Sequence, residues 1–477
     1  MIRINNPLRA FIVLFLALFF SEAQAATFYS RASGTWNTIG TWSTVGIGGI
    51  SSGSTPTSLD DVQIGGGFTV TLPASAVTCL SVNLISAPGT LTFATGGTLN
   101  VTGAFSSAAS TTINMSAGGT LNVGGNLTLA GTFIAGTGTV VLNGAAAQNL
   151  SLTALTLNIF STAGSGTKRN IGGSFTVTST LTVGTGTTLD LGTTLTSLNA
   201  TTAVINGTLL FSSVAVKTVV CGSTLSGSGT IDMSTGAGTL AHSLILNGTP
   251  NTIGSFVSNI QSNVTYGGTN QSLFVSSNYT NLIINSSGIA SLSGSTGTVN
   301  GGTLTINTGR TLSAGTNTLT MGGDWINSGT FTAGSGNVIF NGLGIQNITG
   351  SSSTTFNSLV IANTSGPVNV SQVIAAAFTN ISTGAMLDLG TLSGHNLGAV
   401  SGTGTLALSA NNAGFTSFPA GNFSSFLAPG GTGTVYYNNT TSYTISGIGS
   451  NYYNLQIGGT GVKALSTSIT VNNNLLI

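Results

Sequence analysis

Short triplets in which two apolar residues flank a polar one recur along most of the chain. Clear examples are Leu99-Asn100-Val101, Leu121-Asn122-Val123, Leu181-Thr182-Val183 and Leu304-Thr305-Ile306. A period of two places the outer side chains on one face of a strand and the middle one on the other. Such a short strand is stable only when a similar strand stacks on it and covers the same apolar face. The pattern therefore predicts short strands in stacked coils, with glycine at the sharp corners.

The spacing of one repeated segment gives the length of a coil. Gly96–Val101 (GGTLNV) recurs without change as Gly118–Val123, which lies 22 residues later. This distance suits a single coil of a β-helix. We therefore predict an all-β fold, a right-handed parallel β-helix (β-solenoid). It should occupy residues 81–477, behind an N-terminal cap region at residues 26–80.

A longer repeat is superimposed on the coils. The stretch Leu121–Gly144 matches Leu319–Gly342 with a constant shift of 198 residues, and weaker copies begin near Val264 and Val435. The same shift relates two further pairs of segments, Gln148-Asn149 with Gln346-Asn347 and Leu189–Gly192 with Leu387–Gly390. We predict four copies of one unit, near residues 121–192, 263–310, 319–390 and 430–477.

The composition supports strands over helices and over disorder. Glycine accounts for 70 of 477 residues, and only 3% of residues are charged, against about 25% in typical domains. Disordered chains are poor in apolar residues, whereas this one is 40% hydrophobic with a mean hydropathy of +0.43. Gly, Thr, Ser, Asn and Val are weak helix formers, so strand is the expected structure.

The first 25 residues have the pattern of a cleaved signal peptide. Arg3 and Arg9 precede or flank an apolar run, Ala10–Phe20, and Ala23-Gln24-Ala25 supplies small residues for cleavage. The run is shorter than the roughly 20 residues of a membrane-spanning helix, which disfavours the alternative of a membrane anchor. We predict cleavage after Ala25 and a secreted, extracellular or outer-cell-surface chain without a transmembrane segment.

Charge excludes one class of partner. Without residues 1–25, the chain keeps six basic residues, six aspartates and no glutamate, and its formal net charge is zero. A nucleic-acid-binding protein needs a stripe of Lys and Arg to neutralise phosphates. We therefore expect no nucleic-acid partner, and no electrostatic attraction to anionic membranes.

The two cysteines, Cys79 and Cys221, are 142 residues apart. With one coil per 20 to 25 residues and about 4.8 Å of rise per coil, they would lie roughly 30 Å apart. A disulfide requires Cα atoms within about 7 Å. Both thiols are expected to be buried and free.

Several motifs with Gly, Thr, Trp and Asp lie near the N-terminus: Gly34-Thr35-Trp36, Thr41-Trp42-Ser43, Pro56, Asp60–Ile64 and Gly67–Leu72. This region resembles the opening of many large secreted proteins of Bacteroidota-type bacteria and the start of the eight-glycine extracellular domain. The repeats are similar to the β-strand arrays of such surface proteins, some exported by the type IX system and others autotransporter-like. The resemblance implies a β-helix surface or adhesin-like protein.

One feature departs from that class. Type IX cargo normally ends in a C-terminal sorting domain, whereas this sequence ends at Asn474–Ile477 within a strand-like run. We therefore expect either a fragment or a different secretion route.

The carboxylates are candidates for chemistry, but each has a structural interpretation that we favour. Asp60 and Asp61 could be calcium ligands or an acid/base pair, or one of them could cap the turn before a strand at Val62–Ile64. Asp190 and Asp388 are equivalent in the repeat, which favours a role in building the coil. Asp324 corresponds to Asn126, as expected for a hydrogen-bonding side chain.

No other motif predicts a catalytic, metal or cofactor site. His242 and His395 lie in different repeat units and have no metal-ligand spacing. The sequence contains no P-loop, dinucleotide fingerprint or calcium-binding nonapeptide. We expect no cofactor.

Aromatic residues supply the remaining candidates. Five tyrosines gather in the last repeat copy: Tyr436, Tyr437, Tyr443, Tyr452 and Tyr453. They predict either a platform on which sugars stack or, as we favour, cross-strand packing in the core. Trp36 and Trp42 are expected to close the N-terminal end of the solenoid.

Taken together, these features favour a non-catalytic, secreted or cell-surface structural protein of adhesin type, whose partners are glycans, matrix or other cells. Two alternatives stay open. A carbohydrate-active β-helix enzyme would need clustered carboxylates in a groove. An ice- or lattice-binding protein would use ladders of Thr-x-Thr, to which Gly138-Thr139 and Gly186–Thr188 belong.

Overall fold

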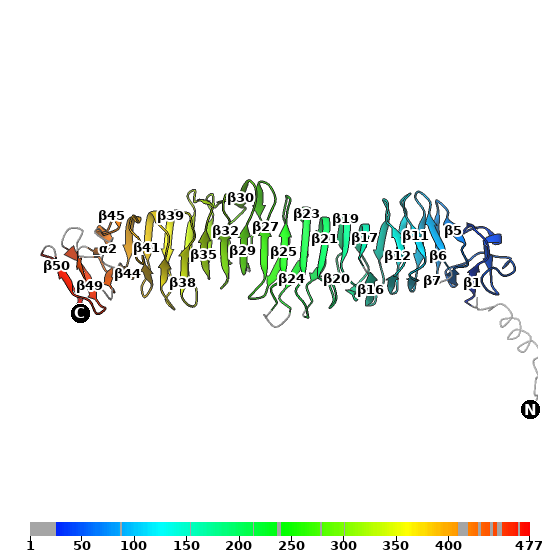
Figure 1. Ribbon diagram of the computed structural model, residues 1–477, viewed down its shortest axis with the longest axis horizontal. Coiled ribbons are helices and arrows are strands. Elements are labelled where there is room, and N and C mark those ends of the chain that lie inside the picture. The colour runs from blue at the N-terminus through cyan, green and yellow to red at the C-terminus, as the bar shows by residue number, and fades with distance from the viewer. Residues whose placement is uncertain are drawn as a thin grey trace, which may run out of the picture. The chain divides into compact units, whose positions relative to one another are not determined.

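The computed structural model describes residues 25–85, 88–152, 154–212, 214–235, 240–276, 279–299, 301–408, 418–427, 431–438, 442–445, 451–465 and 468–477. The chain divides into two compact units, unit 1 up to Ile159 and unit 2 from Phe160. Nearly all regular structure is β-strand, and strands of successive coils pair in parallel (Figure 1). The predicted all-β parallel β-helix is therefore confirmed. The predicted signal peptide, except Ala25, lies outside the described residues.

In unit 1, successive coils contribute strands to three sheets. The first sheet contains β1 (Thr27–Ser30), β4 (Asp61–Ile64), β7 (Ser81–Leu84), β10 (Phe105–Ser107), β13 (Leu127–Leu129) and β16 (Gln148–Leu152). The second contains β2 (Gly34–Thr35), β5 (Thr69–Leu72), β8 (Thr90–Phe93), β11 (Thr112–Asn114) and β14 (Thr132–Ile134). The third contains β6 (Ala76–Cys79), β9 (Thr98–Val101), β12 (Thr120–Val123) and β15 (Thr139–Leu142).

The register of β9 and β12 shows how the triplets stack. Leu99 lies opposite Leu121, and both side chains are fully buried. Between the apolar positions, Asn100 lies opposite Asn122 on the outer face, where Asn122 Nδ2 donates to Asn100 Oδ1 at 2.8 Å. The predicted coil of 22 residues and the alternation of inward and outward side chains are both confirmed at this position.

The N-terminal end of unit 1 is a cap built around two tryptophans. β3 (Trp42–Ser43) pairs antiparallel with β1, after the 3-10 turn η1 (Ile39–Thr41). Trp36 and Trp42 are buried with their rings edge to face and 5.1 Å apart, and Trp42 Nε1 donates to the Trp36 carbonyl at 2.6 Å. Parallel pairing already begins within the predicted cap range 26–80, with β1 on β4 and β4 on β7.

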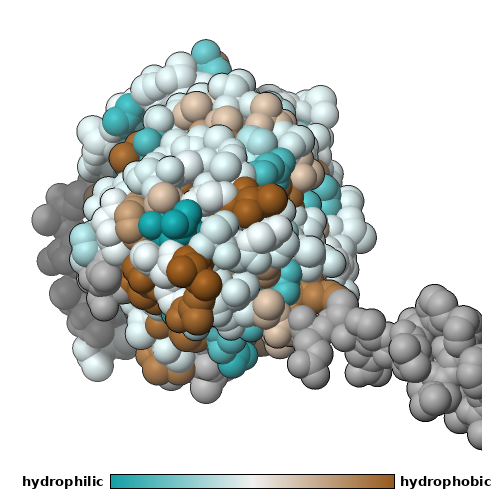
Figure 2. Space-filling view, turned by 90° about the vertical axis from the view of Figure 1, so that its right-hand side faces the viewer, coloured by the Kyte–Doolittle hydropathy of each residue, from teal (hydrophilic) through white to brown (hydrophobic). Residues whose placement is uncertain are grey.

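The outer surface of the cap is weakly polar. Figure 2 views this end, where most of the surface is pale and the brown, apolar patches are small and separate. The exposed large apolar side chains of the cap are Ile39, Val45, Ile50 and Leu59. Isolated apolar residues of this kind are normal on protein surfaces.

The boundary between the units falls within β17 (Leu155–Thr162), and unit 2 is also built from parallel sheets. Its first sheet contains β18 (Gly166–Asn170), β20 (Thr187–Asp190), β22 (Thr208–Leu210), β24 (Thr230–Met233) and β26 (Ser255–Ser258). The longest contains β19 (Phe175–Val183), β21 (Ser197–Ile205), β23 (Thr218–Ser226), β25 (Ser243–Leu246), β27 (Asn263–Tyr266), β29 (Asn281–Ile284), β32 (Thr303–Ile306), β35 (Asp324–Asn327), β38 (Gln346–Thr349), β40 (Val368–Val370), β42 (Met386–Asp388), β44 (Thr405–Leu408), β46 (Thr434–Tyr437), β49 (Asn454–Ile457) and β52 (Leu475–Leu476).

Two further sheets complete the coils in the second half of unit 2. One contains β28 (Gln271–Leu273), β30 (Ile289–Leu292), β33 (Thr311–Ser313) and β36 (Thr330–Thr332). The other contains β31 (Thr296–Val299), β34 (Thr318–Met321), β37 (Asn337–Phe340), β39 (Thr354–Ile361), β41 (Ile374–Ile381), β43 (Asn396–Gly402) and β45 (Ala420–Asn422). The remaining elements are the short helix α2 (Ser424–Leu427) and the strand pairs β47 (Tyr443–Ile445) with β50 (Lys463–Leu465) and β48 (Asn451–Tyr452) with β51 (Thr470–Val471).

A buried glutamine makes the same contacts in three copies of the long repeat. Gln346 Oε1 accepts from Gly342 N at 2.8 Å, and its Nε2 donates to the carbonyls of Met321 (2.9 Å) and Gly323 (2.7 Å). The equivalent contacts around the two other glutamines are Gly144 N, Val123 O and Gly125 O for Gln148, and Gly268 N, Leu246 O and Gly248 O for Gln271. The side chain therefore ties one coil to the preceding one.

Two runs of unusually long strands have equivalent places in that repeat. The first run is β17, β19, β21 and β23, and the second is β39, β41 and β43. In β39, Ser358–Ile361 pairs with β37, whereas Thr354–Phe356 lies beyond that pairing and continues onto β41. β39 therefore continues past the edge of the shorter β37, and its extra segment pairs with the next long strand, β41.

Candidate functional site

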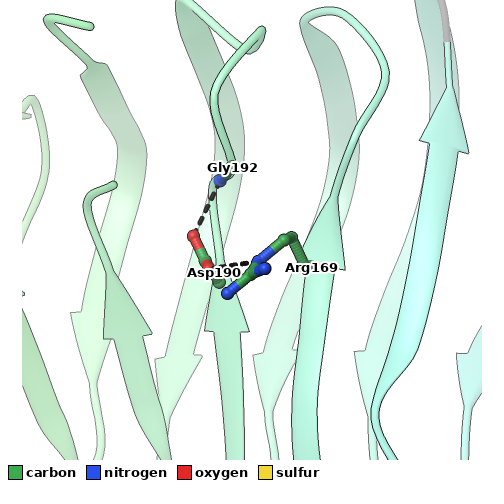
Figure 3. Close-up of polar contacts among 3 residues, drawn as sticks. All are labelled: Arg169, Asp190 and Gly192. Atoms are coloured by element: carbon green, nitrogen blue, oxygen red, sulfur yellow. Dashed lines mark hydrogen bonds and ion pairs between the residues drawn. The ribbon is translucent and has the colours of Figure 1, made fainter. Parts of the chain in front are cut away.

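The aspartates at equivalent repeat positions close turns. Asp190 Oδ1 accepts from Gly192 N at 2.8 Å, and Asp388 Oδ1 accepts from Gly390 N at 2.9 Å. Asp190 also forms an ion pair with Arg169 on the neighbouring strand, with Nε and Oδ2 2.8 Å apart (Figure 3). These contacts confirm the coil-building interpretation of both carboxylates.

The other predicted carboxylates have similar roles. Asp60 accepts from the backbone and hydroxyl of Thr57, as expected of a turn-closing side chain, and Asp61 accepts from the Ser81 hydroxyl. Asp324 Oδ1 accepts from Asn347 N at 2.8 Å, which repeats the contact between Asn126 Oδ1 and Asn149 N. Among the described residues, no group of three or more His, Cys, Asp or Glu side chains could hold a metal ion.

Both histidines are buried acceptors of backbone hydrogen bonds. His242 Nδ1 accepts from Lys217 N at 3.1 Å, and His395 Nδ1 accepts from Ile374 N at 3.3 Å. Burial lowers the pKa of each imidazole below its ordinary value, so both are neutral at pH 7. The structure places them in separate coils, as the sequence indicated.

The cysteines are buried and free, as predicted. Burial raises the pKa of the Cys221 thiol to about 12. Burial, with smaller contributions from Asp61 and Asp60, raises the pKa of Cys79 to about 12 as well. Neither thiol is therefore a nucleophile at neutral pH, because the reactive species is the thiolate.

The tyrosines proposed as a sugar platform do not form one surface. Tyr437 and Tyr452 are 3% and 1% exposed, and their hydroxyl groups are hydrogen-bonded at 3.0 Å. The same arrangement occurs in another repeat copy, where Tyr266 and Tyr279 are buried with hydroxyls 2.8 Å apart. Core packing, the interpretation we favoured, therefore holds for this pair.

The remaining members of the tyrosine group differ in exposure. Tyr436 and Tyr453 are half-exposed, on β46 and just after β48. The side chain of Tyr443 lies outside the described part of the structure. Of the five candidates, Tyr436 and Tyr453 are thus the described ones that a ligand can reach.

A hollow on the outer surface of unit 2 lies over the second run of long strands. It encloses about 540 Å³ and is lined by Phe331, Thr332, Ala333, Gly334, Thr355, Phe356, Asn357, Ala375, Ala376, Ala377 and Asn396. Register places Thr355, Ala375 and Asn396 side by side on β39, β41 and β43. The hollow therefore runs across successive coils, and the three small alanines of β41 form part of its floor.

The lining of this hollow is uncharged and combines polar with apolar side chains. Thr332, Thr355 and Asn396 are exposed and offer hydroxyl and amide groups. Phe378 directly follows the alanines and is 58% exposed, which is unusual for an aromatic side chain in a strand. No residue that lines the hollow is charged.

A smaller hollow of about 320 Å³ lies over the first run of long strands. Its lining is Thr176, Val177, Thr178, Asn199, Ala200, Thr201, Val220 and Gly222. The burial patterns of β19 and β41 align Thr176, Val177 and Thr178 with Ala375, Ala376 and Ala377, so the two hollows share this segment of the repeat. Larger side chains fill the first one, and Thr180 stands where the second has Phe378.

Sequence reasoning did not predict this hollow. Its signal is the segment Ile374–Phe378 (IAAAF), where three alanines interrupt the alternation of large apolar and polar residues. Comparison with Thr176–Thr180 of the first copy would have identified both the missing side chains and the added phenylalanine.

No protein-family model, curated protein or solved structure matches this chain. In the ranges that the structure describes, no helix combines the length and apolar character needed to cross a bilayer.

Proposed function

We propose that this chain is a secreted or cell-surface, non-catalytic structural protein of adhesin type that binds uncharged glycans through the hollow at β36, β39, β41 and β43. The observation that carries the proposal is the exposed Phe378, which directly follows the lining residue Ala377 of an uncharged hollow with hydroxyl and amide groups. A sugar ring has an apolar face that packs on an aromatic ring and hydroxyls that exchange hydrogen bonds with Thr and Asn.

The shape and charge of the hollow support an extended neutral ligand. The lining residues come from four strands of successive coils, so a chain lying along the hollow contacts several coils at once. An enzyme that cleaves glycosidic bonds needs two carboxylates about 5 to 10 Å apart, and neither hollow is lined by Asp or Glu. Binding without turnover is therefore the activity that this lining favours.

Replacing Phe378 with Thr, the residue of the first repeat copy, should weaken binding to a neutral oligosaccharide at least tenfold. The change removes the aromatic face but leaves a residue that the same strand position accepts at Thr180. Isothermal titration calorimetry with neutral oligosaccharides measures the effect.

Ile260→Ala is the matched control, because Ile260 is an exposed apolar residue of unit 2 outside both hollows. It should leave the affinity unchanged. Equal binding by the Phe378→Thr protein and the parent would reject the hollow as the glycan site.

A second candidate function rests on a regular threonine array in unit 1. The outward positions of β5, β8, β11 and β14 align in one row as Thr69, Thr90, Thr112 and Thr132. A neighbouring row contains Thr71, Thr92 and Asn114. Strand geometry spaces the hydroxyls by about 4.8 Å between strands and about 6.6 Å along them, a repeat suited to an ordered polar lattice such as ice.

If this array binds ice, the protein should show thermal hysteresis, and the double substitution Thr90→Lys with Thr112→Lys should abolish it. The lysines project from the centre of the array and break its match to a lattice. Nanolitre osmometry provides the measurement. Hysteresis that survives the double substitution, or no hysteresis in the parent protein, would dismiss this candidate.

A further inference from the structure

The carboxylate of Asp60 is buried without a cationic side chain. The residue is 5% exposed, and its Oδ2 accepts from Thr57 N (2.8 Å) and Thr57 Oγ1 (2.6 Å). Its Oδ1 accepts from the backbone nitrogen of Ala26 at 2.9 Å. No Lys, Arg or His of the described residues forms an ion pair with it. Burying a carboxylate with neutral donors alone is costly, because a buried charge is normally paired.

The backbone nitrogen that donates to Asp60 Oδ1 belongs to Ala26. Cleavage after Ala25 would make Ala26 the first residue of the chain. Ala26 immediately precedes β1, and its carbonyl accepts from Asp61 N at 2.9 Å, which fixes it beside β4. Ala25 is exposed. The chain can therefore begin at Ala26 without losing the strand pairing that holds this nitrogen against Asp60.

We propose that cleavage after Ala25 creates an α-ammonium group at Ala26 that forms a buried ion pair with Asp60, so that processing completes the N-terminal cap. Hydrolysis adds the hydroxyl of water to the Ala25 carbonyl and leaves an amine on Ala26, which takes up a proton at neutral pH. The amide donor of the uncleaved chain becomes a charged donor at the same position. The proposal rests on the export step of the proposed function.

The surroundings favour the charged pair. The Cys79 thiol, which is coupled to Asp60 and Asp61, is neutral because burial raises its pKa to about 12. Although burial acts to raise the pKa of Asp60, the hydrogen bonds from Thr57 and Ala26 hold it below its ordinary value. Asp60 is thus ionised at neutral pH and ready to receive a cation.

The test is the pKa of the α-amino group in the chain that begins at Ala26, measured from the pH dependence of its reaction with an amine-selective acylating reagent. An ordinary α-amine has a pKa near 7.7–8.0. Pairing with Asp60 should raise it by at least one unit and slow acylation at pH 7 about tenfold. The Asp60→Asn protein should return to the ordinary value, and Asp232→Asn, which removes a carboxylate in unit 2, should not.

A second measurement needs no substitution. Acetylating Ala26 removes the charge and should lower the thermal midpoint of the cap, seen as earlier exposure of Trp36 and Trp42 by fluorescence, whereas the Asp60→Asn protein should respond little. An α-amine of ordinary pKa together with no effect of acetylation would overturn the proposal. Glycan binding by unit 2 is measured separately. Failure of the ion-pair proposal therefore does not overturn the proposed glycan binding, and the reverse also holds.

Discussion

Gly192→Ala should destabilise the coil around Asp190 by about 3 to 5 kcal/mol. Gly192 has a φ of +67°, a conformation that residues with a Cβ rarely adopt. A Cβ at this position would lie 1.5 Å from the carbonyl oxygen of Asn170, which is backbone and cannot move aside alone. The substitution would also displace the nitrogen that donates to Asp190 (Figure 3). Backbone strain at Gly192 and loss of its hydrogen bond to Asp190 therefore both contribute to the expected destabilisation.

Hydrogen exchange measured by mass spectrometry is the appropriate readout, because a solenoid opens locally and has no single unfolding free energy. Gly309→Ala is the matched control. Gly309 has a similar φ of +72°, but nothing lies within 4 Å of an added Cβ, so only the backbone strain remains. Equal protection losses in the two proteins would show that the close approach to Asn170 does not matter.

Gln346→Leu should cost about 3 kcal/mol or more, although it keeps the size of the side chain. The substitution leaves Gly342 N and Gly323 O without the partner that Gln346 provides, and it removes one of two contacts of Met321 O, which still accepts from Asn341 N. Each buried backbone group that loses its hydrogen bond costs about 1 to 3 kcal/mol. We expect a lower thermal midpoint for unit 2 and faster exchange at the amide of Gly342.

Gln261→Leu serves as the control, because Gln261 is exposed and its substitution leaves the coil contacts in place. If Gln346→Leu and the control have equal thermal midpoints, the hydrogen bonds of the Gln346 side chain do not contribute to holding the coils together. The same test applies to Gln148 and Gln271, which make the equivalent contacts.

The repeating part of the fold was predictable from the sequence, because one solution recurs in it many times. The segment Gly96–Val101 and its copy at Gly118–Val123 fixed the coil length, and β9 and β12 pair with that offset. The exchange of Asn126 for Asp324 indicated a hydrogen-bonding role, and both accept from the residue 23 positions later. A repeated sequence therefore predicts which positions are buried and which contacts recur from copy to copy.

The candidate site was less predictable, because it depends on how one coil deviates from the others. The hollow arises from Ala375–Ala377 lying between Thr355 and Asn396, a juxtaposition set by register and not by distance along the chain. Burial of Tyr437 and Tyr452 could likewise not be read from alternation alone, because an aromatic in a strand suits either face. Only the three-dimensional structure shows that their hydroxyls meet.

Affinity for neutral and for uronic-acid-containing polysaccharides, measured at 50 mM and at 500 mM salt, tests the proposed function most directly. An uncharged hollow predicts binding to a neutral polysaccharide that is insensitive to salt, because no charged pair forms that ions could screen. The polysaccharide should also keep its length during the measurement. Binding confined to acidic polysaccharides and lost at high salt, or shortening of the bound chain, would contradict a non-catalytic site for neutral glycans.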